Sequence, residues 1–105
     1  MIRYHLTYAA AAARAAEVIE AILSSDAWQR YSRVLPDFTF MEAREPFRHI
    51  FDADENGEGD GWLGVMETMI VDEMRLNGPR FAANPATIDA IVARMGSHPN
   101  VQLES

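Results

Sequence analysis

Hydrophobic and polar residues alternate at the start of the chain. Every second residue from Ile2 to Tyr8 is apolar, and the residues between them are polar. This period of two predicts a half-buried strand. The alanine-rich run from Ala9 to Leu23 then predicts a helix, because its apolar residues recur at helical spacing. Thr7 can cap this helix, because the Thr7 side-chain oxygen can accept a hydrogen bond from a backbone amide of the first turn.

The next segments are short and their pattern is less regular. Ser25 can cap a helix over 26–34, which Pro36 would end. Residues 38–41 are apolar or β-branched and predict a second strand. The alternation over 47–51 predicts that the strand resumes there, before the turn signal Asn56-Gly57.

Residues Trp62–Leu76 fit two patterns. As a helix, they place most of their apolar residues on one side, and Asn77-Gly78-Pro79 is a good helix stop. As a strand, they would complete a hairpin with the residues before the turn. The local pattern favours the helix and the overall order of elements favours the strand.

The C-terminal part has clearer signals. Asn84 can cap a helix that has Pro85 at its first position and Gly96 at its end. A turn at His98-Pro99-Asn100 leads to Val101-Gln102-Leu103, which reads as a final strand. This phrase is similar to the last helix and strand of ACT-type regulatory domains and of small dimeric α+β-barrel proteins.

Together these elements predict an α+β fold, a ferredoxin-like βαββαβ two-layer sandwich with an acidic loop between its second and third strands. The alternative is a mostly α fold in which Trp62–Leu76 is helical. A chain of 105 residues is expected to form a single domain over 1–105.

Charge is concentrated in one stretch. Residues 52–73 contain eight of the 16 acids, whereas the nine bases, all arginine, lie elsewhere, and the net charge is −7. The five acids of the loop 52–60 are the predicted partner-binding residues: Asp52, Asp54, Glu55, Glu58 and Asp60. Such a loop would bind a basic protein surface. The acidic balance argues against direct binding to nucleic acid, because nucleic-acid phosphates attract basic side chains.

The same loop resembles the first half of an EF-hand calcium loop. Asp52, Asp54 and Asn56 stand at positions one, three and five, and Gly57 stands at the sharp turn. Asp60 at position nine could add an oxygen. Position twelve, which should supply a bidentate glutamate, is Leu63, so these four candidates predict weak calcium binding at best, and the expected cofactor content is none.

A histidine–carboxylate arrangement is the candidate for catalysis. In a ferredoxin-like sheet His5 and Glu67 could meet on one face, with His49 nearby, and such pairs serve in acid–base chemistry. Phe38, Phe40 and Trp62 would wall the pocket. The simpler reading is a surface pair that contributes little.

These features yield three candidate functions. The first is a small acidic, inhibitor-like regulatory protein that binds a basic partner. The second is a dimeric α+β-barrel enzyme or small-molecule-binding protein, and the third is calcium binding. No cysteine and no apolar stretch of membrane-spanning length occur in the sequence. We therefore expect a cytoplasmic protein that does not bind membranes. The similarity to dimeric α+β-barrel proteins also leads us to expect a homodimer.

Overall fold

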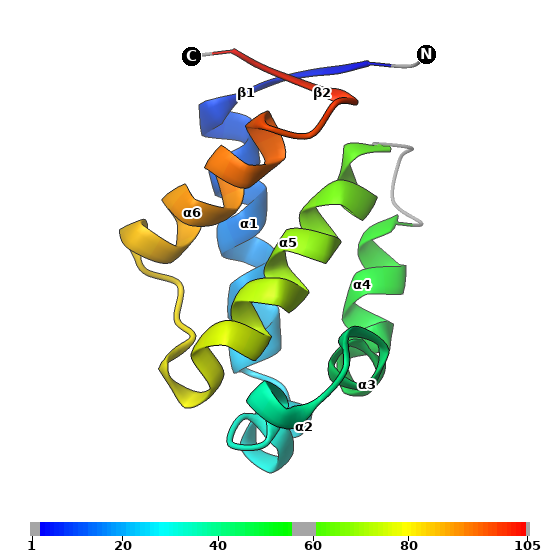
Figure 1. Ribbon diagram of the computed structural model, residues 1–105, viewed down its shortest axis with the longest axis vertical. Coiled ribbons are helices and arrows are strands. Elements are labelled where there is room, and N and C mark those ends of the chain that lie inside the picture. Colours follow the sequence, from blue (N-terminus) through cyan, green and yellow to red (C-terminus); the bar gives the residue numbers. More distant parts are fainter. Residues whose placement is uncertain (1–2, 56–60, 105) are drawn as a thin grey trace.

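The computed structural model describes residues 3–55 and 61–104, and most of them are helical (Figure 1). The elements in chain order are β1 (Tyr4–Thr7), α1 (Tyr8–Leu23), α2 (Asp26–Tyr31), the 3-10 turn η1 (Leu35–Asp37), α3 (Phe40–Arg44), the 3-10 turn η2 (Glu45–Phe47), α4 (Arg48–Glu55), α5 (Trp62–Asn77), the 3-10 turn η3 (Gly78–Arg80), α6 (Pro85–Gly96) and β2 (Val101–Glu104).

The predicted ferredoxin-like α+β sandwich is wrong. In the described ranges the only sheet has two strands, in which β1 pairs parallel with β2 and Tyr4 lies opposite Val101. This ribbon covers one end of a bundle of helices (Figure 1). The mostly α alternative, with Trp62–Leu76 helical, fits the structure.

The strands expected over 38–41 and 47–51 are absent: Phe38 and Thr39 lead into α3, which begins at Phe40, and residues 47–51 run from η2 into α4. Thr39 and Glu42 form a capping box that starts α3, since each side chain accepts a hydrogen bond from the other residue's backbone amide. Phe47 and Phe51 are both buried, and residues four apart lie on the same face of a helix. The alternation of apolar residues that suggested a strand is therefore also compatible with a helix.

Helix α5 lies between the other helices. Its buried residues recur at helical spacing: Leu63, Met66, Glu67, Ile70, Val71, Glu73 and Met74. The helix ends at Gly78, whose backbone φ is +53° and whose amide donates to the carbonyl of Met74. The helix stop predicted at Asn77-Gly78-Pro79 is confirmed.

The predictions at both ends of the chain are confirmed. Thr7 accepts a hydrogen bond from the amide of Ala10 at 3.1 Å and caps α1. Asn84 accepts from the amide of Thr87 at 2.9 Å and caps α6, with Pro85 in its first turn. The Ser25 cap is also present, although α2 ends at Tyr31, before the predicted position 34.

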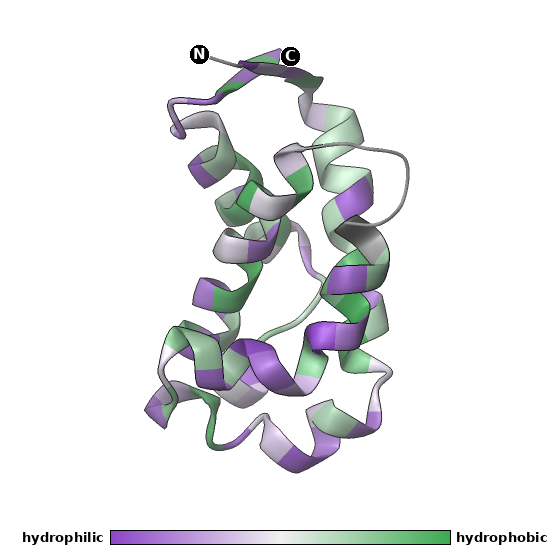
Figure 2. Cartoon of the chain, turned by 90° about the vertical axis from the view of Figure 1, so that its right-hand side faces the viewer, coloured by the Kyte–Doolittle hydropathy of each residue, from purple (hydrophilic) through white to green (hydrophobic). Residues whose placement is uncertain are grey.

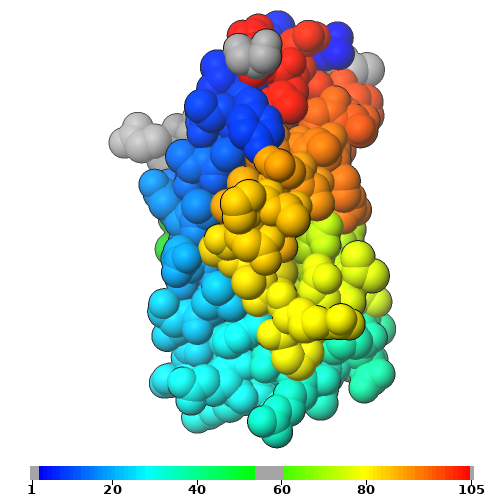
Figure 3. Space-filling model, turned by 90° about the vertical axis from the view of Figure 1, so that its left-hand side faces the viewer, coloured from blue at the N-terminus to red at the C-terminus, as the bar shows by residue number. Residues whose placement is uncertain are grey.

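The core joins the helices to the ribbon. Hydrophilic and hydrophobic residues alternate along the helices, as expected for amphipathic elements with one buried side (Figure 2). α6 packs beside α1, and strands β1 and β2 lie together at one end (Figure 3). Fully buried Ala11 and Ala15 allow close packing on α1.

No helix among the described residues has the length and apolar character needed to cross a membrane.

Candidate functional site

The three residues of the predicted acid–base site lie apart. His5 is on β1, where its Nδ1 is 3.3 Å from the carboxylate of Glu104. His49 is exposed on α4, and Glu67 is buried on α5 against Arg44. The expected walls of the pocket, Phe38, Phe40 and Trp62, are partly buried against the core. The structure therefore does not assemble a histidine–glutamate pair from these residues.

Arg44 lies at the centre of a polar network between helices. Its guanidinium donates from Nε to Glu67 on α5 and from Nη2 to Asp52 on α4, the latter at 2.9 Å. The Arg44 and Glu67 side chains are only 17% and 10% exposed. The guanidinium also lies 5.9 Å from the centre of the Phe51 ring. Arg44 therefore ties α3 to both α4 and α5.

This environment keeps Arg44 charged. Burial by itself lowers the pKa of the guanidinium, but the hydrogen bonds to Glu67 and Asp52 outweigh burial and raise the pKa above its ordinary value. An arginine that stays charged beside two carboxylates holds the three helices together. The sequence carries a signal for this site, because Arg44 falls between Phe40 and Phe47 on an otherwise apolar helical stripe.

The acidic segment begins on α4. Asp52 forms ion pairs with Arg44 and, at 3.8 Å, with Arg48. Asp54 and Glu55 occupy the last turn of α4, whereas Asn56, Glu58 and Asp60 lie outside the described residues. The carboxyl end of a helix carries partial negative charge, and the last turn of α4 contains no base. Negative charge thus accumulates at this end of the helix.

The calcium-loop prediction stays untested, and only its first positions fall on the described helix α4. α4 continues through Glu55, so positions 52 and 54 are helical and fall about 200° apart around the helix axis. In an EF-hand these positions belong to the loop and aim their ligands at one point. No group of three or more potential ligands is placed to hold a metal ion in the described part of the chain. The candidates Asn56 and Asp60 lie outside that part.

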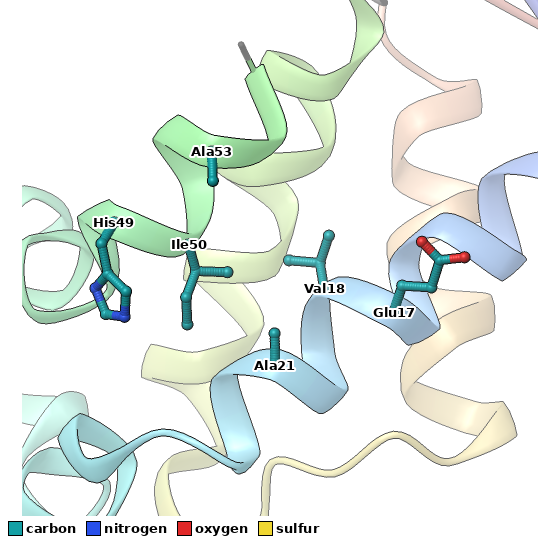
Figure 4. A pocket seen from close by; sticks show the side chains of 6 residues that line it. All are labelled: Glu17, Val18, Ala21, His49, Ile50 and Ala53. Atoms are coloured by element: carbon teal, nitrogen blue, oxygen red, sulfur yellow. The ribbon is translucent and has the colours of Figure 1, made fainter. Parts of the chain in front are cut away.

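A groove lies between α1 and α4 (Figure 4). Its volume is about 460 Å³, and it is lined by Glu17, Val18, Ala21, His49, Ile50 and Ala53. Val18 and Ile50 lie across from each other in the middle, Glu17 lies at one end and His49 at the other (Figure 4). Glu17 accepts a hydrogen bond from Arg14 at 3.1 Å. The groove is an open, mainly apolar surface beside the acidic segment, and sequence reasoning missed it.

No protein-family model, no curated protein and no solved structure matches the chain significantly.

Proposed function

We propose that the protein is a small interaction module whose acidic segment, residues 52–60, binds a basic surface of a partner protein. The observation that carries this proposal is the continuity of that segment with the apolar groove between α1 and α4. Ala53 lines the groove and lies within the segment. A partner that carries both apolar and basic side chains would therefore make both kinds of contact in one place.

A basic amphipathic helix has the required chemistry. Its apolar side chains would lie against Val18, Ala21 and Ile50, and its basic side chains would pair with acids of the segment to which Ala53 belongs. Helices that bind in grooves do so through apolar residues at spacings of three and four. Asp52 and Glu17 already have arginine partners. The proposal assigns the attraction to the four other acids of the segment, which are Asp54, Glu55, Glu58 and Asp60.

Calorimetric titration with a synthetic helix, with leucine on one face and lysine on the other, tests the charge requirement. Neutralising the four acids by Asp→Asn and Glu→Gln should abolish binding, and added salt should weaken wild-type binding. A matched control neutralises four exposed acids elsewhere, Glu20, Asp26, Asp37 and Asp89, with the same change in net charge. Equal loss of binding in both variants would overturn the proposal.

A second pair of variants tests the groove. Ala21→Arg places a long charged side chain in the groove and should prevent binding. Ala13→Arg makes the same change at an exposed position of α1 that does not line the groove, and should leave affinity close to that of the wild type. Both positions are exposed and helical, so both variants should fold.

The cytoplasmic location and the homodimer stay predictions, and sedimentation of the purified protein tests the dimer.

A further inference from the structure

A second groove lies between η1, α5 and α6. It has a volume of about 380 Å³ and is lined by Pro36, Asp72, Arg75, Leu76 and Arg94. Leu76 is 76% exposed, the largest fraction among the exposed large apolar side chains in the described residues. A partner that covers an apolar side chain at a groove gains free energy, because apolar surface is removed from water.

The charge of this groove is opposite to that of the protein as a whole. It contains two arginines and one acid, in a chain of net charge −7. The acid, Asp72, accepts a hydrogen bond from Arg94 at 2.9 Å. Arg75 is half-buried, and its Nε donates to the carbonyl of Phe38 at 2.8 Å. No carboxylate within the described part of the chain forms an ion pair with Arg75.

The position of Arg75 has a structural role as well. It lies in the last turn of α5, where a cation interacts favourably with the helix end, and its bond to Phe38 holds the segment after η1. That role uses one of the guanidinium's donors. The bond fixes the side chain at the groove, where a guanidinium can form two parallel hydrogen bonds to an incoming carboxylate.

We infer that this groove binds an acidic peptide segment of a partner protein, with a carboxylate at Arg75 and an adjacent apolar side chain on Leu76 and Pro36. Charge complementarity favours this occupant, because a basic segment would meet Arg75 and Arg94. This surface is separate from the α1–α4 groove and has the opposite preference. The protein would then contact two chemically different segments.

Nuclear magnetic resonance titration of the ¹⁵N-labelled protein with a capped peptide of alternating aspartate and leucine tests the inference. Saturable shifts are expected at the amides of residues 72–76 and 94. A peptide with lysine in place of aspartate should produce none there. The inference is overturned if the acidic peptide causes no saturable shift at these residues, or if both peptides act equally.

Two matched pairs of variants identify the contacts. Leu76→Ser should weaken binding roughly tenfold through loss of an apolar contact. Met41→Ser, at an apolar residue 63% exposed on α3, should not change it. Arg94→Gln should also weaken binding, whereas Arg33→Gln, at an exposed arginine outside the groove, should have little effect. Equal effects within either pair would contradict the assigned site.

Discussion

Arg44 on α3 and Glu67 on α5 form an ion pair from which most solvent is excluded, although they are 23 positions apart in the chain. The pair belongs to a network that also includes Asp52 on α4. It ties three helices together, because the guanidinium on α3 reaches one carboxylate on α4 and another on α5.

Replacement of Arg44 should destabilise the fold. Arg44→Met leaves the buried Glu67 carboxylate without its guanidinium partner, and we expect the free energy of unfolding to fall by about 3 kcal/mol. Urea denaturation measures it. Arg30→Met, at an exposed arginine, should stay within about 0.5 kcal/mol of the wild type. The double variant with Glu67→Met should lose less stability than Arg44→Met alone; equal losses in the Arg44 and Arg30 variants would contradict this role.

The capping box of α3 should respond to acid. The backbone amide of Thr39 donates to the Glu42 carboxylate at 2.9 Å, and this bond, with that of the Thr39 side chain, lowers the pKa of Glu42 below its ordinary value of 4.5. Because the folded pKa is depressed, the contribution to stability is present above pH 4.5 and is lost as the pH falls through the lowered pKa.

Nuclear magnetic resonance titration of the Glu42 carboxyl carbon checks this shift directly. Thr39→Ala should move the pKa of Glu42 toward 4.5, since it removes the side-chain bond. Thr68→Ala, at an exposed threonine on α5, serves as the control and should leave the titration of Glu42 unchanged. An unshifted Glu42 pKa in Thr39→Ala would show that the hydroxyl does not contribute.

Alanine at Gly78 should be unfavourable. The backbone there has a φ of +53°, which residues with a side chain rarely adopt, and an added Cβ would lie 2.9 Å from Cγ of Pro36. We expect Gly78→Ala to lower the free energy of unfolding by about 1–3 kcal/mol. Thermal denaturation followed by circular dichroism measures the change, and unaltered stability would contradict the conformation described for this turn.

Alanine at Gly64 should have the opposite effect. Gly64 lies inside α5, and an added Cβ would meet no atom of the described residues within 4 Å. Gly64→Ala should therefore raise the free energy of unfolding by about 0.5–1 kcal/mol, because alanine loses less conformational freedom when a helix forms. Gly78→Ala, measured in parallel, is the contrasting substitution. A loss of stability in both variants would indicate that the Gly64 position is more crowded than described.

Part of the candidate site could be predicted from the sequence. The acidic segment and Glu67 can be picked out in the sequence as candidate residues, but the sequence does not indicate which side chain pairs with Glu67. The sequence predicts that His5 faces Glu67 across a sheet. In the structure Arg44 forms the ion pair with Glu67 instead, because α3 packs on α5. The α1–α4 groove is formed by residues from two separated helices, so no local pattern could indicate it.

The sequence by itself determined the elements with strong local signals. The caps at Thr7, Ser25 and Asn84 satisfy the first amides of their helices, and these bonds involve only neighbouring residues. Over 38–51 and in Trp62–Leu76 the spacing of apolar residues suits both helix and strand. In the tertiary structure, burial of Phe47 and Phe51 favours the helix in the first segment, and burial of Met66, Ile70 and Met74 favours it in the second.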